Sequence, residues 1–328
     1  MSRPPAAESW GWHSLDTGIG GSEEAVVRLS RAFTRRGHSV TVYGSGSVGR
    51  DTGSWGEVFY EPMSSYYPSD VLLIWRLPEA LQQLRPFEAV WTGLWLHDSV
   101  SRERVAAVSH LVDIIWCISN YHASLYTGIP NVYVGRNGID PDDFNNMDFS
   151  KDVNDGRNPA KLVYTSSPFR GLDGLLEMFP EIKARVPEAE LHVFYGFESA
   201  DKMGHTSTPE GKALKEKIMK LCEQPGVVWR GRIGQSELYR EVRSAGVFSY
   251  PSTWSEENCI AVAIAQACGA WPVVYPRGAL FQSTVFGWKV EKEEFVNAVV
   301  AAIRTNDGRE RMIKWARTNL SWDETAQL

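Results

Sequence analysis

Short apolar segments alternate with amphipathic ones along most of this chain, and that order constrains its fold more than any other feature. In the second half the pattern predicts strands at 161–165, 190–195, 227–230, 247–250 and 271–275, with helices at 172–185, 212–222, 236–245 and 259–268. A largely helical region at 291–319 follows. Strand–helix alternation predicts an α/β fold with parallel sheets covered by helices.

The first half shows the same alternation but begins differently. A glycine loop, Gly18-Ile19-Gly20-Gly21, leads into an apolar helix that Gly37 ends. Strands are then predicted at 40–42, 71–75, 89–91, 114–118 and 131–134. A doubly wound domain normally starts with a buried strand before its first glycine loop, but residues 9–16 have no strand pattern. We therefore expect the first strand to be absent or replaced by another segment.

A change of composition separates the halves. Residues 140–161 are acidic and polar and contain Asn, Gly and Pro, which is typical of a linker. We expect an N-terminal domain at 1–145, a linker at 146–160 and a C-terminal domain at 161–310. The remaining residues, 311–328, are predicted to form a helix that can pack back on the N-terminal domain. The length of 328 residues is sufficient for two such cores.

Charge and hydropathy exclude several classes of partner. The net charge of −6 gives no basic surface for a nucleic acid. Arg28, Arg31, Arg35 and Arg36 follow a helical spacing, which predicts a solvated helix face. No apolar run approaches 18 residues, so we expect at most peripheral contact with a membrane.

Cysteine usage favours a reducing compartment. The four cysteines, Cys117, Cys222, Cys259 and Cys268, are scattered and form no C-x-x-C pair. Residues 1–7 are polar and proline-rich, without the apolar core of a signal peptide. These features predict free thiols in a cytoplasmic protein.

Two loops have the chemistry of a phosphate site. Successive backbone amides at Gly20 and Gly21, ahead of a helix, can cradle a phosphate, although a glycine turn before a helix is also common in structures. The loop from Ser166 to Arg170 lies between a strand and a helix, at the edge of the sheet where α/β proteins bind ligands. Arg170 is a fixed cation suited to a diphosphate, or else a surface arginine that caps the loop.

A third loop, around Glu256, precedes a helix of small residues. The start of that helix, near Asn258 and Cys259, would offer free amides to an anion, and Glu256 or Asn258 could bind hydroxyl groups. Glu256 and Glu257 could equally be partners of the helix dipole. His97 follows a strand, and a lone histidine there is more often structural than catalytic.

The sequence offers no metal site that we favour. Asp140-Pro141-Asp142 has the D-x-D spacing of metal-dependent sugar transferases, but it follows Asn137-Gly138 and is predicted to be a turn. Neither a metal cluster nor a Ser-His-Asp arrangement is supported by spacing.

Taken together, these segments resemble the retaining glycosyltransferase family 4 over nearly the whole chain. The matching strings are Gly18 to Glu24 with Gly37-His38, Leu96-His97-Asp98, Asn137-Gly138-Ile139-Asp140 with Phe144, Arg170-Gly171, Gly231-Arg232-Ile233, Tyr250-Pro251-Ser252, and Glu256 to Gly269 with Pro272-Val273-Val274. Each string is weak alone, and their occurrence in the family's order carries the resemblance.

The resemblance implies the GT-B fold, in which two Rossmann-like domains face a cleft. The acceptor would bind mainly to the first domain and the nucleotide-sugar donor to the second. It also implies retention of configuration at the anomeric carbon, with no required metal or other cofactor. The donor would be a UDP- or GDP-hexose, and the acceptor a glycan, a lipid or a small molecule.

The resemblance also implies roles for individual residues. Gly20 and Gly21 would approach the donor diphosphate, and Arg170 would neutralise it. His97 would face the donor sugar and Glu256 would lie near the sugar hydroxyls. The nucleotide base of the donor would lie near Gly231 and Arg232.

The chain departs from the family pattern at two further positions. The family's second glutamate, eight residues after Glu256, is Ile264 here, and isoleucine cannot bind ribose hydroxyls. The usual arginine five residues before Arg170 is Thr165. An active hexosyltransferase is therefore the leading hypothesis, with two alternatives: a non-catalytic GT-B subunit or glycan-binding relative, and a sugar-nucleotide epimerase. For the active enzyme we expect weak nucleotide binding, which Ile264→Glu would strengthen.

Overall fold

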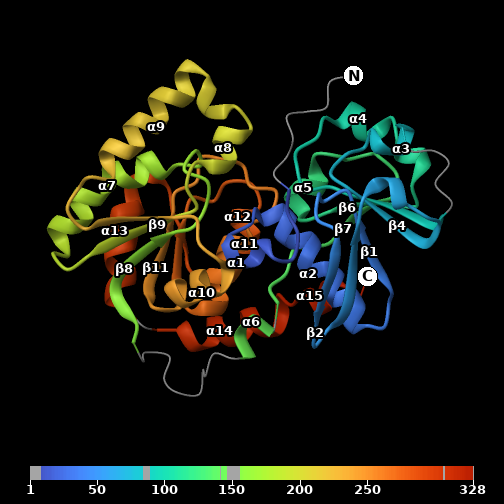
Figure 1. Cartoon of the computed structure of the whole chain (residues 1–328). Coiled ribbons are helices and arrows are strands. Elements are labelled where there is room, and N and C mark those ends of the chain that lie inside the picture. The colour runs from blue at the N-terminus through green and yellow to red at the C-terminus, as the bar shows by residue number, and fades with distance from the viewer. Residues whose placement is uncertain (1–8, 84–88, 141, 146–155, 306, 328) are drawn as a thin grey trace.

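The second half contains one parallel sheet of six strands, five of which the sequence predicts; the sixth, at Trp288–Lys289, has only two residues and is not predicted. The computed structural model describes residues 9–83, 89–140, 142–145, 156–305 and 307–327, and it shows two α/β halves side by side (Figure 1). The strands are β8 (Asn158–Tyr164), β9 (Glu190–Phe194), β10 (Val227–Gly231), β11 (Ala245–Tyr250), β12 (Trp271–Val274) and β13 (Trp288–Lys289). Their order, β10-β9-β8-β11-β12-β13, is that of a doubly wound Rossmann sheet.

Helices cover both faces of this sheet. They are α7 (Leu172–Arg185), α8 (Glu198–Lys202), α9 (Pro209–Leu221), α10 (Gln235–Arg243), α11 (Ile260–Cys268), α12 (Leu280–Ser283), α13 (Lys292–Arg304) and α14 (Arg309–Asn319). The small residues of α11 let it pack closely, and it ends at Gly269, which has a φ of 87°. Every residue of β11 is buried, as expected for a strand covered on both faces.

The first half contains two separate sheets rather than one. The first has the order β1-β3-β2 and the second the order β4-β5-β6-β7. Their strands are β1 (Val40–Tyr43), β2 (Gly49–Gly53), β3 (Gly56–Glu61), β4 (Ser69–Trp75), β5 (Ala89–Trp95), β6 (Ile114–Cys117) and β7 (Val132–Val134). The associated helices are α1 (Ser14–Thr17), α2 (Gly21–Arg35), α3 (Ala80–Gln83), α4 (Arg102–Ala106), α5 (Asn120–Ser124) and α6 (Asp142–Asn145).

The split follows from the missing first strand, which the structure confirms for residues 9–16. That segment holds only an isolated bridge between Trp10 and Gly46 and the start of α1. In the classic doubly wound order, this strand lies between the two groups that are separate here. Aromatic packing joins the two sheets instead, because Trp10 meets Trp75 of β4 at 5.4 Å between ring centroids. Val26 of α2 packs against the hydrophobic clusters of both sheets.

The C-terminal residues contact both halves. Helix α14 packs on α11 of the second half, whereas α15 (Trp322–Thr325) packs on α2 of the first (Figure 1). The amide of Trp322 donates to the carbonyl of Ile139 at 3.0 Å, and the indole of Trp322 lies against Trp95. The expected linker lies mostly outside the described residues, and β8 begins at Asn158, within its last three residues.

The arginine face of α2 is not solvated, so that prediction is wrong for its first two members. Arg31 donates two hydrogen bonds to Asp51 of β2, at 2.7 and 3.0 Å, and lies over the Trp55 ring. Arg28 is 3% exposed and pairs with Asp143 at 2.6 Å. The acidic partners lie far along the chain, where helical spacing gives no sign of them.

No helix among the described residues is long and apolar enough to cross a bilayer.

Candidate active site

Arg170 and Glu256 form the centre of a polar cluster at the carboxyl ends of β8 and β11. Arg170 Nη1 donates to both carboxylate oxygens of Glu256, at 2.9 and 2.8 Å. Tyr250, the last residue of β11, donates its hydroxyl to Glu256 at 2.5 Å and is 3.0 Å from the hydroxyl of Ser166. The fold thus brings together three residues predicted from the sequence, together with Tyr250.

Burial governs the electrostatics of this cluster. Glu256 is 2% exposed, and burial raises the pKa of its carboxyl group although Arg170 and Tyr250 oppose that effect. Burial lowers the pKa of Arg170, but Glu256, Tyr250 and Cys259 together outweigh it, so that pKa is raised and the guanidinium stays charged. Both hydrogen bonds to Glu256 use Nη1, and the Arg170 side chain is 36% exposed. Its Nε and Nη2 groups can therefore still donate to a phosphate.

The backbone at Glu256 is fixed by a close approach of another loop. Ala279 donates its amide to the carbonyl of Glu256 at 2.7 Å. A side chain at Gly278, which has a φ of 56°, would come within 2.6 Å of that carbonyl oxygen. Helix α11 begins only at Ile260, with no acidic residue in its first turn, so Glu256 and Glu257 are not partners of its dipole.

His97 lies in the first half, just past the end of β5. It is 6% exposed, and its ring packs edge-on against Trp95 with centroids 4.3 Å apart. Burial, together with the positive charge of Arg76, holds the pKa of His97 well below its usual range, so the ring is neutral. Its Nε2 has no hydrogen-bond partner among the described residues. A buried, unpartnered ring nitrogen is available to a hydroxyl group of a ligand.

Arg76 and Asp98 flank His97. Arg76 follows β4 with a φ of 68°, which is uncommon for a residue with a side chain. Its guanidinium donates to both oxygens of Asp98, at 2.5 and 2.8 Å, and to Glu23 of α2 at 3.2 Å. Such strained backbone is often found at functional sites.

The glycine loop of the first half faces the second half. A side chain at Gly18, which has a φ of 103°, would meet Arg232 at 2.5 Å. At Gly20 it would come within 3.9 Å of the hydroxyl of Tyr195, and at Gly21 within 3.8 Å of Ile260. Glycine is therefore needed at position 18 for the two halves to approach each other this closely.

Tyr195 and Gly231 shape the opposite wall. Tyr195 follows β9 with a φ of 96° and donates its amide to the carbonyl of Gly231 at 2.9 Å. Gly231 itself has a φ of 66°. The guanidinium of Arg232 lies 5.9 Å from the centroid of the Tyr195 ring. Arg232 thus lies next to Gly18 of the glycine loop.

The side chains of Asn258 and Cys259 are directed elsewhere. Asn258 donates its side-chain amide to the carbonyl of Ile118 in the first half at 2.9 Å. Cys259 is 4% exposed within the main hydrophobic core, and burial raises the pKa of its thiol. All four cysteines are free thiols, as the sequence predicts.

Ile264 and the acidic residues at 140 and 142 contribute to the packing and ion pairs of the fold. Ile264 is 5% exposed and belongs to the main hydrophobic core of the second half. Asp140 lies 3.4 Å from Arg28 and from Arg35, and Asp142 opens α6. Among the residues that the structure describes, no group of His, Cys, Asp or Glu could hold a metal ion.

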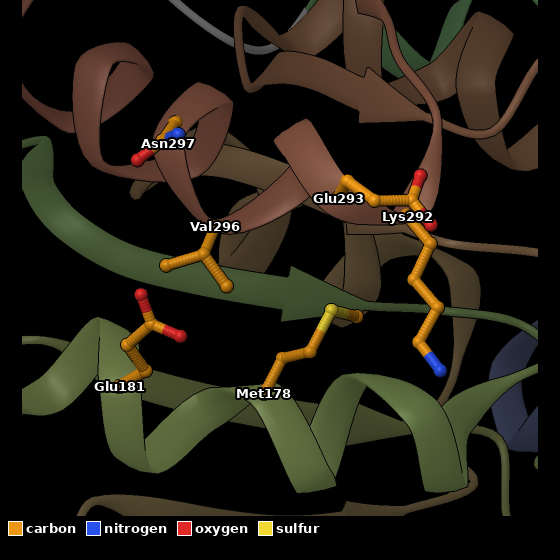
Figure 2. Close-up of a pocket in the computed structure, with 6 residues that line it drawn as sticks. All are labelled: Met178, Glu181, Lys292, Glu293, Val296 and Asn297. Atoms are coloured by element: carbon orange, nitrogen blue, oxygen red, sulfur yellow. The ribbon is translucent and has the colours of Figure 1, made fainter.

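A surface hollow of about 340 Å³ lies elsewhere, between α7 and α13 (Figure 2). Its lining residues are Met178, Glu181, Lys292, Glu293, Val296 and Asn297. None of them belongs to the loops described above, so the hollow is separate from the candidate site.

Three residues of the candidate site were given no role by sequence reasoning. Tyr250 was noted in a strand and in the string Tyr250-Pro251-Ser252 but was given no role, although a tyrosine at the end of a buried strand points to the ligand edge of the sheet. Arg76 follows a strand in the same way. Glu257 gave no signal that separates it from its neighbour Glu256.

Solved structures confirm the fold. The sucrose-phosphate synthase of Thermosynechococcus elongatus superposes with a TM-score of 0.69 at 16% identity, covering 95% of this chain and 93% of that one. HepE of Anabaena, in complex with UDP and glucose, gives a TM-score of 0.66 at 15% identity, covering 95% of each chain. The fold is therefore GT-B, as expected.

Sequence comparison shows the family. A curated relative, the mannosylfructose-phosphate synthase of Agrobacterium fabrum, is 30% identical over 118 residues, which are 36% of this chain and 25% of that protein. The match thus spans about a quarter of that relative. The family model described as glycosyl transferases group 1 matches residues 144–318, more than half of the chain. This protein belongs to the glycosyl transferases of group 1.

Proposed function

We propose that the protein transfers a hexose from a UDP- or GDP-sugar to a glycan, a lipid or a small molecule, with retention at the anomeric carbon. The observation that carries the proposal is the Arg170–Glu256–Tyr250 cluster at the carboxyl ends of β8 and β11. It combines a partly exposed cation with a buried carboxylate at the edge of a Rossmann sheet.

The donor diphosphate would bind to Arg170 through Nε and Nη2, close to Ser166 and the backbone of Gly20 and Gly21. Negative charge develops on the diphosphate as the glycosidic bond breaks, and positioned cations and amides stabilise it. Asn258 would contribute only its backbone amide, since its side chain is bound to Ile118; for the buried Cys259, likewise, only the backbone amide would contribute.

The sugar would lie between the halves, with His97 on one side and Glu256 on the other. Because the pKa of His97 is low, its neutral ring would bind a sugar hydroxyl by hydrogen bonding rather than by charge. The nucleotide base of the donor would lie at Gly231 and Arg232. The UDP and glucose in the HepE complex support a nucleotide-sugar donor, and the free thiols support a cytoplasmic location.

One observation favours a second candidate, a non-catalytic GT-B relative that binds a partner or a glycan. Ile264 packs in the core at the position where the family would place a ribose-binding carboxylate. A site without that carboxylate gives up a charge-assisted hydrogen bond to the donor.

Donor hydrolysis and transfer with a panel of UDP- and GDP-sugars separate these functions. Release of UDP or GDP, with the sugar moved to water or to an added acceptor, supports the transferase. Nucleotide binding without turnover favours the non-catalytic relative, and formation of an epimeric nucleotide sugar would identify an epimerase.

A further inference from the structure

Glu257 extends from the second half into the first. Its Oε1 accepts hydrogen bonds from the backbone amide of Ser99 at 3.2 Å and from the Ser99 hydroxyl at 2.5 Å. Its carbonyl accepts from the hydroxyl of Ser119 at 2.6 Å. Glu257 is 7% exposed, so water competes little for these bonds.

The loop that Glu257 binds, residues 97–100, carries His97 and is also fixed from within the first half. Arg76 binds the carboxylate of Asp98. The Nε2 of His122 lies 3.1 Å from the carbonyl of Asp98, and its Nδ1 accepts from the amide of Ile118, so Nε2 is the donor. The hydroxyl of Tyr126 donates to the carbonyl of Val100 at 3.0 Å. The loop is therefore a rigid element that Glu257 attaches to the second half.

Glu257 acts electrostatically on Arg76 and His122, which both hold this loop. Burial lowers the pKa of Arg76, but Asp98, Glu23 and Glu257 together raise it above its ordinary value. Burial lowers the pKa of His122, and Glu257 opposes that effect. The negative charge of Glu257 thus acts on the same loop that its hydrogen bonds hold.

The position of Glu257 in the chain links the two candidate catalytic side chains. It directly follows Glu256, and its partner Ser99 is two residues from His97. Any shift of the Glu257–Ser99 contact changes the separation of His97 and Glu256. A misplacement of about 1 Å in such a site can lower the rate about a hundredfold.

We propose that Glu257 is a positioning residue, which sets His97 against Glu256 by hydrogen bonding the loop of Ser99 across the two halves. The proposal rests on the proposed transferase function for its catalytic consequence, but the contact itself can be tested without activity. Nothing in the role requires Glu257 to touch the donor.

The test compares Glu257→Ala, Glu257→Gln and Ser99→Ala with the parent, and uses Glu188→Ala, at an exposed glutamate, as the matched control. We expect Glu257→Ala to lower the turnover number of sugar transfer about tenfold to a hundredfold. Its dissociation constant for UDP, measured by calorimetry, should stay within about twofold of the parent, since the donor does not touch it. Glu257→Gln keeps an acceptor oxygen for Ser99 and should restore most of the turnover.

Hydrogen exchange supplies the readout that is independent of activity. The amide of Ser99 should exchange at least about tenfold faster in Glu257→Ala than in the parent, and near the parent rate in Glu257→Gln. Ser99→Ala retains the backbone hydrogen bond and should show a smaller loss of turnover. If Glu257→Ala does not fold, Ser99→Ala and Glu257→Gln still report on the contact.

Unchanged exchange at Ser99 in Glu257→Ala would overturn the inference, whether or not the parent is active. Loss of UDP affinity equal to the loss of turnover would overturn it too, because Glu257 would then be a donor ligand. A parent that binds no nucleotide and transfers no sugar refutes the proposed function, while faster exchange in Glu257→Ala would still support the contact.

Discussion

Glu24 is a buried carboxyl group at the junction of the two halves, and its titration should make the stability of the protein depend on pH. It lies on α2, is 3% exposed, and accepts hydrogen bonds from Gln235 at 2.8 Å and Tyr239 at 3.1 Å, both on α10. Burial raises its pKa to about 7 from an ordinary 4.5, against the attraction of Arg28 and with the repulsion of Asp143 added.

The sign and size of the effect follow from that pKa. Between about pH 4.5 and about pH 7 the folded protein keeps Glu24 protonated, while the unfolded chain has lost the proton. The folded state therefore binds more protons in this window, and stability falls as the pH rises through it. The stabilising contribution is complete below pH 4.5 and lost above about pH 7. One unit of pKa corresponds to about 1.4 kcal/mol, so the loss amounts to about 3 kcal/mol.

The perturbation that isolates this group is Glu24→Gln. Glutamine cannot titrate, and its single carbonyl oxygen can still accept from Gln235 while its amide group donates to the hydroxyl oxygen of Tyr239. Arg28 keeps Asp140 and Asp143 as partners. Burial also raises the pKa of Asp143. Without the negative charge of Glu24 that pKa should fall, which further weakens the pH dependence of stability in the variant.

Urea unfolding at several pH values between about 5 and about 8 measures the effect as the difference between parent and variant. The free energy of unfolding of the variant, relative to that of the parent, should rise by about 3 kcal/mol from the lower to the upper end of this range. Glu23→Gln, at the adjacent and more exposed residue that binds Arg76, is the control and should not change the slope. A parent–variant difference that stays constant with pH would refute the reasoning.

Three further predictions concern the candidate site. Arg170→Ala should weaken UDP or GDP binding in calorimetry by about 1.5–3 kcal/mol, whereas Arg185→Ala, at the far end of α7, should leave it unchanged; equal affinities would remove Arg170 from the site. His97→Ala and Glu256→Gln should each lower turnover at least about tenfold with unfolding little changed, and full activity in both would end their assignment. Ile264→Glu should lower thermal stability because it buries a carboxylate, and UDP should stabilise this variant more than the parent. Equal UDP-induced shifts in melting temperature would contradict a ribose contact at that position.

The contrast between the two faces of α2 shows what local pattern cannot predict. The helix itself follows from apolar spacing and the glycine loop, and it is observed at Gly21–Arg35. The burial of Arg28 and Arg31 cannot be predicted from that spacing, because their partners Asp143 and Asp51 belong to distant segments of the chain. A charged residue is assigned to solvent by pattern alone, and only its partners in space overturn that assignment.

The hairpin of β2 and β3 was also missed. Gly49–Gly53 carries charged and polar residues without apolar alternation, so it has no strand signal of its own. Its strand character comes from antiparallel pairing with β3, in which Asp51 lies opposite Val58. Edge strands of this kind depend on their neighbour more than on their composition.

The sequence by itself determined the parallel sheet of the second half, the missing first strand and the loops at the strand ends, because these depend on periodicity and on glycine positions within a few residues. The tertiary structure decided that the first half divides into two sheets joined by Trp10 and Trp75. It also decided that Arg170 pairs with Glu256 and that Glu257 crosses to Ser99. Such contacts depend on which strand ends and loops meet in space. They also depend on burial, because a buried charge requires a partner. The spacing of nearby residues in the sequence encodes neither.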